Sequence, residues 1–156
     1  MLKHRVVITG IGVISPVGTG KDEVWHNLIN GNSGIGPVTR FDATDFTTKI
    51  AGEVKNFQPE DYLDKKEARR MDRFAQFAVA ATKIAVDDAG LNLEKTNKDR
   101  AGVVFGTGIG GTQTFETQHH ILKEKGPSRV SPFFVPMMIG NMAAGQIALN
   151  IGFTGP

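Results

Sequence analysis

The pattern of apolar and polar residues along the chain predicts two β-strands and a weaker third one. Residues 5–9 and 101–105 are short, largely apolar runs that end at a glycine, which is typical of strands buried on both faces. Residues 49–54 are a weaker third candidate. Because strands covered on both faces occur mainly in α/β proteins, the pattern predicts an α/β fold in which residues 5–9 form the first strand.

The spacing of apolar residues also predicts four helices. The first follows Thr19, a possible N-cap, and ends at Gly31. The second follows Asp72, also a possible N-cap, and is apolar on most sides, so we expect it to be buried. The third is polar, and the fourth is rich in small residues. The four segments are residues 19–31, 72–89, 112–125 and 137–150.

Two segments between these elements predict irregular structure. Residues 32–62 are rich in Gly, Pro, Asp and Thr, so we expect most of them to run over the surface. Residues 127–136 contain three prolines and two phenylalanines, which predicts an aromatic loop before the last helix.

Composition places the chain among ordinary soluble globular proteins. Of its 156 residues, 40% are hydrophobic and 22% are charged. No apolar run reaches the length of a membrane span, and the basic opening is not followed by a secretory h-region, so we expect a cytoplasmic protein with no membrane partner.

Charge and residue types exclude several kinds of site. There is no cysteine, which excludes disulfides, thiolate metal sites and a cysteine nucleophile within these residues. The net charge of +2 gives no global case for nucleic acid. His119 and His120 are adjacent, so on a helix they point in different directions and cannot act as an i, i+4 metal pair. We expect no metal site.

The glycine loop, residues 106–111, has two possible uses. Gly106, Gly108 and Gly111 match the G-x-G-x-x-G spacing of dinucleotide-binding loops, but the strand and acidic residue that should follow are replaced by the proline-rich segment. A nucleotide-dependent oxidoreductase therefore stays as an alternative. The other use is close backbone approach, with Ile109 placed either to obstruct or admit an apolar chain, or simply to join the core.

A basic patch precedes the second helix. Residues 65–73 contain five cations and two anions, a local excess of +3. Lys66, Arg69 and Arg70 are three to four residues apart and would share one face of a helical turn, which suits a phosphate or an acidic partner helix. The alternative is a solvated helix start.

Six collinear strings together resemble the type II β-ketoacyl-acyl-carrier-protein synthases, which are thiolase-like condensing enzymes. Each motif is weak alone, but the six stand in register over essentially the whole chain. They are RVVITGIGVISPVG (5–18), FTTKIAGEV (46–54), DKKEARRMDRF (64–74), GTGIGG (106–111), SPFFVP (131–136) and GFTGP (152–156).

The resemblance implies a thiolase-like fold in which two βαβαβ halves pack helices against five-stranded mixed sheets. Residues 1–156 would form an incomplete N-terminal half. It also implies cytoplasmic fatty-acid elongation by a homodimer, in which acyl groups condense with malonyl-acyl-carrier protein and release CO₂. The family's cysteine, two histidines and lysine lie beyond residue 156, so no catalytic residue falls in this chain and we expect it to be inactive alone. No cofactor is expected, because phosphopantetheine arrives on the carrier protein.

The resemblance also assigns site residues. Ile109, beside Gly108, corresponds to the gate of the acyl channel, and Phe134 with Val135 corresponds to residues that line or close it near the dimer interface. Lys66, Arg69, Arg70 and Arg129 match basic positions that receive acidic acyl-carrier protein and its phosphopantetheine. Ser128 departs from the pattern, because relatives often have a second basic residue there.

A third hypothesis is that the chain acts without catalysis, as a docking or dimerising module. In either case, the second and fourth helices are too apolar to face solvent on two sides. We therefore expect the chain by itself to expose large hydrophobic patches that other residues or a partner would cover.

Overall fold

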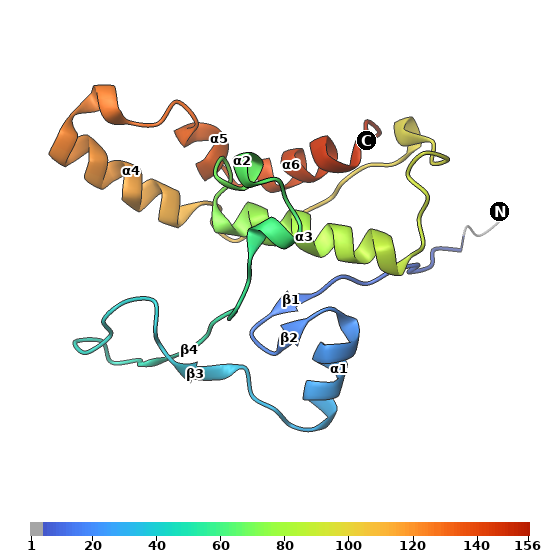
Figure 1. Ribbon diagram of the computed structural model, residues 1–156, viewed down its shortest axis with the longest axis horizontal. Coiled ribbons are helices and arrows are strands. Elements are labelled where there is room, and N and C mark those ends of the chain that lie inside the picture. The colour runs from blue at the N-terminus through green and yellow to red at the C-terminus, as the bar shows by residue number, and fades with distance from the viewer. Residues whose placement is uncertain (1–4) are drawn as a thin grey trace. The chain divides into compact units, whose positions relative to one another are not determined.

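The computed structural model describes residues 5–156, so residues 1–4, part of the basic opening, lie outside the description (Figure 1). The described residues form two compact units. The first holds residues 5–57 and Lys83–Leu91, and the second holds Gln58–Thr82 and Asn92–Pro156. The helix α3, Arg73–Asp88, contributes residues to both units.

The first unit contains two small antiparallel sheets and one helix. Strands β1 (Ile14–Ser15) and β2 (Gly18–Thr19) pair in one sheet, and β3 (Ile35–Pro37) and β4 (Ile50–Gly52) pair in the other. The predicted strand at 49–54 is thus confirmed in its centre. In the second sheet Gly36 lies opposite Ala51.

The helix predicted after Thr19 is confirmed as α1, Lys21–Ile29, but its expected cap is wrong. Thr19 belongs to β2, and Gly20 occupies the N-cap position with a φ of 81°, a left-handed conformation that favours glycine. The Glu23 carboxylate instead accepts a hydrogen bond from the Thr19 N–H at 2.7 Å. The chain therefore enters the helix through a tight glycine turn.

Asp88 fixes the N-terminal segment against the last turn of α3. Its carboxylate accepts a hydrogen bond from the Ile11 N–H at 3.0 Å and pairs with the Lys21 ammonium. The Lys21 hydrogen bond, followed by that of Ile11, lowers the pKa of Asp88. A lowered carboxyl pKa stabilises the fold above the unfolded-state pKa, and this contribution is lost as the pH falls through the folded-state pKa.

The second unit is helical and holds the core. Its short helices are η1 (Pro59–Asp61), α2 (Lys65–Ala68), η2 (Lys98–Arg100), η3 (Pro127–Arg129) and α5 (Phe134–Met138). Its longer ones are the first part of α3, α4 (Thr112–Lys125) and α6 (Met142–Ile151). The buried apolar side chains come mainly from α2, α3 and α6 and the segments that flank α2. They are Leu63, Ala68, Met71, Ala75, Ala78, Val79, Ala80, Ala143, Ile147 and Ile151.

The predicted strands at 5–9 and 101–105 are not formed. Both segments are without a ladder partner among residues 5–156, and Val6 and Val104 are almost fully exposed. A strand buried on both faces needs neighbouring strands and covering helices, and neither unit supplies them. Large apolar side chains are exposed, among them Val7, Ile8, Trp25, Ile29 and Leu149, but of these five only Leu149 lies in one of the two helices from which apolar patches were predicted.

The last predicted helix is split into two. The first part, α5, begins at Phe134 inside the predicted loop, and Ile139 then takes an extended conformation before α6 starts at Met142. The Met138 carbonyl accepts a hydrogen bond from the Gly111 N–H at 2.8 Å. The helix is thus interrupted where the glycine loop contacts it.

No helix within residues 5–156 is long and apolar enough to cross a bilayer.

Candidate acyl-gate and docking site

The glycine loop ends in a close backbone contact with the break between α5 and α6. A Cβ atom on Gly111 would lie 2.5 Å from the Met137 carbonyl oxygen, and one on Gly110 would lie 2.7 Å from that of Met138. Gly110 also has a φ of 94°. Glycine is required at both positions because the backbones approach more closely than a side chain allows.

Residues 106–109, the first part of the same loop, are exposed, and in this part the Thr107 methyl would lie 2.9 Å from a Cβ atom on Gly140. A Cβ atom on Gly106 or Gly108 would meet nothing within 4 Å, and Ile109 is 80% exposed. The interpretation in which Ile109 joins the core is therefore wrong for this chain. The loop therefore exposes the Ile109 side chain to solvent, two residues before Gly111, whose backbone is held against α5.

Phe134 lies in an apolar hollow between α4 and the segment that returns along it, which Figure 1 shows in orange. Its ring centroid is 6.2 Å from that of Phe115. Gln118 holds the returning segment, because its side-chain oxygen accepts a hydrogen bond from the Ser131 N–H at 2.7 Å. The hollow has a volume of about 220 Å³. Its lining residues are Phe115, Gln118, His119, Leu122, Val130 and Phe134.

The predicted channel residues are only partly brought together. Val135 follows Phe134 on α5 but is more than half exposed, and neither it nor Ile109 lines the hollow. Gly108 is exposed as well. The helix α4 connects the glycine loop with Phe134. It begins where the glycine loop ends, and its Phe115 ring contacts the Phe134 ring.

The predicted docking cations lie at the surface of the second unit. Lys66 is in α2, Arg69 and Arg70 follow it, and Arg129 ends η3; all four are exposed. None of the four forms an ion pair with another residue of the described chain.

Arg70 has a second role that the sequence did not reveal. Its guanidinium lies 4.5 Å from the centroid of the Phe133 ring, a cation–π contact. These two residues, with Glu67, Met71, Pro136 and Gln146, line a hollow of about 320 Å³. The basic patch is thus in direct contact with Phe133, the residue that precedes α5.

The paired histidines are surface residues, as predicted. Both lie on α4 and are exposed, and the His119 ring stacks on Phe115 with a centroid distance of 6.4 Å. The described part of the chain brings together no cluster of histidine, aspartate and glutamate able to hold a metal ion.

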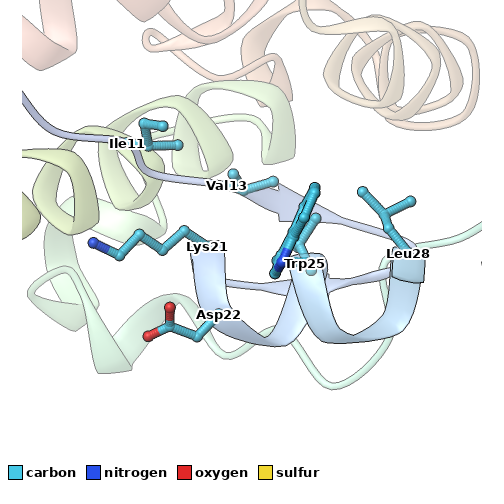
Figure 2. Close-up of a pocket in the computed structure, with 7 residues that line it drawn as sticks. Ile11, Val13, Lys21, Asp22, Trp25 and Leu28 are labelled. Atoms are coloured by element: carbon cyan, nitrogen blue, oxygen red, sulfur yellow. The ribbon is translucent and has the colours of Figure 1, made fainter. Parts of the chain in front are cut away.

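The first unit has a hollow of its own, outside the predicted site (Figure 2). Its volume is about 350 Å³, and Figure 2 shows the Trp25 indole standing beside Val13, with Leu28 further along α1. Apolar side chains of α1 therefore line an open hollow. The remaining lining residues are Ile11, Lys21, Asp22 and Val24.

Comparison with known proteins identifies the class. Residues 3–156 match the family described as beta-ketoacyl synthase, N-terminal domain, and the chain belongs to this family. The computed structure resembles the ishigamide ketosynthase/chain length factor, with a TM-score of 0.84 and 32% identity over 96% of this chain and 38% of that one. A beta-ketoacyl synthase from Burkholderia phymatum STM815 gives a TM-score of 0.79, with 23% identity over 96% of this chain and 37% of that one. The fold is therefore the thiolase-like α/β fold, represented by its N-terminal part.

Curated relatives narrow the resemblance further. The chain is 53% identical over 154 residues to the 3-oxoacyl-[acyl-carrier-protein] synthase 2 of Synechocystis, which covers 99% of this chain and 37% of that protein. It is 52% identical over 152 residues to the protein of the same name from Staphylococcus aureus strain COL, covering 97% and 37%. The chain thus spans about 37% of the length of these relatives. The resemblance drawn from the six motifs is confirmed.

Proposed function

We propose that this chain serves as the N-terminal part of a cytoplasmic 3-oxoacyl-acyl-carrier-protein synthase. Such an enzyme joins an acyl group to malonyl-acyl-carrier protein, releases CO₂ and lengthens the acyl chain by two carbons in fatty-acid synthesis. Within it, residues 5–156 supply the acyl gate and much of the carrier-protein docking surface. The chain has no cysteine, so the thiol that receives the acyl group must come from elsewhere, and we expect the chain alone to be inactive.

The observation that carries the proposal is the position of Ile109. An isoleucine that is 80% exposed on an anchored glycine loop leaves apolar surface free for an apolar ligand. A fatty acyl chain fits this surface because its transfer from water is favourable, by about 0.8 kcal/mol per CH₂ buried. Gly108 gives such a chain close access to the backbone, and Phe134, in its apolar hollow, and the exposed Val135 supply further apolar surface on α5.

The geometry argues against the nucleotide alternative. A dinucleotide would place its pyrophosphate on free N–H groups at the start of the helix that follows the loop. Here the Gly111 N–H is bonded to the Met138 carbonyl, and the Thr114 N–H is bonded to the Asp72 carboxylate at 2.8 Å. A pyrophosphate would find these two N–H groups already bonded, and the negative charge of the Asp72 carboxylate would repel it.

The enzymatic proposal is tested in a synthase of the relatives' length that contains these residues. With acyl- and malonyl-acyl-carrier protein, we expect mass spectrometry to detect 3-oxoacyl-carrier protein and a matching release of CO₂, without added cofactor. The isolated chain should give no product. Saturable NADPH binding at micromolar concentration, without condensation, would favour an oxidoreductase instead.

The docking surface gives a second test. Replacing Arg69 and Arg70 by glutamate in that synthase should weaken carrier-protein binding at least about tenfold at low salt, because attraction becomes repulsion. The loss should shrink as salt screens the charges. Arg69→Glu alone should give part of the effect without disturbing the Arg70–Phe133 contact.

Two exposed cations near the end of α4 supply the control for this test. Replacing Lys123 and Lys125 by glutamate changes the net charge equally and should leave carrier-protein affinity within about twofold. Equal losses in both double variants would show that the effect is non-specific, and the predicted docking site would be wrong. We also propose that Lys66 and Arg129 belong to the docking surface and that the synthase is a homodimer.

A further inference from the structure

Asp72 is a buried carboxylate that begins two helices at once. It is 6% exposed, and Thr114, its partner 42 residues further along the chain, is 7% exposed. One Asp72 oxygen accepts hydrogen bonds from the Thr114 N–H at 2.8 Å and from the Thr114 hydroxyl at 2.6 Å. The other accepts from the Phe74 N–H at 3.3 Å. The two hydrogen bonds from Thr114 are made at the start of α4, and the hydrogen bond from Phe74 is made at the start of α3.

The carboxylate supplies a cap that α4 lacks in its own sequence. The N-cap position of α4 is Gly111, which has no side chain to accept a hydrogen bond. A capping side chain would normally accept from the second or third N–H of the helix, and Thr114 is the third residue of α4. Asp72, the residue that precedes α3, makes that bond and places a negative charge at the positive end of α4.

This cap lies at the fixed end of the glycine loop. A Cβ atom on Gly111 would be 3.0 Å from an Asp72 oxygen and 2.9 Å from the Met138 Cα. Ile109 stands two residues before this point. A Cβ atom on the intervening Gly110 would lie 2.7 Å from the Met138 carbonyl oxygen, and one on Gly140 would lie 2.9 Å from the Thr107 methyl, whereas Gly106 and Gly108 have no close neighbours. The Asp72 contact is therefore one of the contacts that hold the loop on the C-terminal side of Ile109, together with those of Gly110 and Gly111.

We propose that Asp72 is a positioning residue for acyl-chain selection, because it fixes the start of α4 and thereby the place where Ile109 stands. This inference rests on the proposed function. Since α4 also holds Phe115 and, through Gln118, the segment that leads to Phe134, a displaced helix start would disturb both apolar parts of the site. A misplacement of about 1 Å is enough to change a rate constant about 100-fold in other enzymes.

The test is made in the synthase of the relatives' length, with kcat and KM measured for a short and a long acyl primer. In Asp72→Asn one carboxylate oxygen becomes an NH₂ group, so at least one of the three donors loses its acceptor. We expect the long-to-short ratio of kcat/KM to change about tenfold, carried mainly by the long primer. Thr114→Val, which removes only the hydroxyl, should change the ratio about threefold in the same direction, and Thr114→Ser should restore it.

Asp99 supplies the matched control. In the second unit it accepts a hydrogen bond from the Thr154 hydroxyl at 2.6 Å; Asp99 is exposed and, within residues 5–156, makes no hydrogen bond with the start of α4. Asp99→Asn should leave the primer ratio unchanged, even if the melting temperature falls. A folded Asp72→Asn and a folded Thr114→Val that both keep the wild-type ratio would overturn the inference.

An Ile109→Phe reference separates failure of the inference from failure of the proposed function. If Ile109→Phe shifts the primer ratio and neither Asp72→Asn nor Thr114→Val does, Ile109 is the gate but Asp72 does not position it. If the unmodified synthase forms no 3-oxoacyl product, the proposed function fails and the inference fails with it. If Asp72→Asn does not fold, the Thr114→Val and Thr114→Ser pair decides by the same ratio.

Discussion

Replacing Gly111 by alanine is expected to destabilise the protein by about 1–3 kcal/mol, the usual cost of forcing extra atoms into a packed site. The reason is steric, because Gly111 has a φ of −83°, which other residues adopt readily. The added Cβ would lie 2.5 Å from the Met137 carbonyl oxygen and 2.9 Å from the Met138 Cα, and both of these are backbone atoms that cannot turn aside. Urea unfolding of the variant and the parent protein measures the difference.

Gly106→Ala is the control within the same loop. No atom lies within 4 Å of its added Cβ, and its φ is outside the left-handed region. We expect this variant to match the parent protein or to gain up to about 1 kcal/mol, because alanine restricts the unfolded chain. If the two variants lost equal stability, the close contact between the loop and α5 would not exist in solution.

Ile109→Phe is expected to lower kcat/KM for long acyl primers by about tenfold or more, while short primers are affected much less. Changes in apolar fit at a pocket are typically worth 10- to 200-fold in discrimination. Because Ile109 is 80% exposed here, the larger ring should not disturb the packing of residues 5–156. The measurement is the elongation rate of the synthase of the relatives' length over a series of primer lengths.

A size series at the same position provides the control for this prediction. Ile109→Val and Ile109→Ala remove atoms, so they should keep long primers or accept them better. Activity that falls equally at all primer lengths in Ile109→Phe, or that does not follow side-chain size, would show that Ile109 does not gate an acyl channel.

The helices could be predicted closely where the signals are local. The predicted bounds of α4, residues 112–125, agree with the structure, since glycines stand on both sides of a polar helical run. α3 differs by one residue at each end, because a run rich in alanine favours helix along its whole length. The break after Met138 could not be predicted, since it arises where Gly111, 27 residues earlier, takes up a backbone carbonyl.

Strand formation depends on partners that lie far away in the sequence. Residues 5–9 and 101–105 have the composition of buried strands, but their pairing needs neighbours that neither unit supplies. The fold class was nevertheless predicted, because six short motifs in register carry more information than the apolar pattern of any one segment. The family match over residues 3–156 confirms it.

The assignment of the candidate-site residues stays a prediction, and nothing in the sequence indicated the contacts that these residues make. The motifs pointed to Ile109, Phe134 and the basic patch, whereas the cation–π contact of Arg70 with Phe133 joins segments about sixty residues apart and leaves no local signal. Asp72 was interpreted only as the cap of its own helix. Its bonds to Thr114 depend on how α3 and α4 pack, which spacing alone does not determine.

The most direct test of the account is a crystal structure of the synthase of the relatives' length, loaded with a long acyl group. We predict continuous density for the acyl chain in van der Waals contact with the Ile109 side chain, at about 4 Å. A parallel crystal grown with NADPH should show no nucleotide at this loop. Density for a pyrophosphate against Gly108, with the acyl chain elsewhere, would contradict the account.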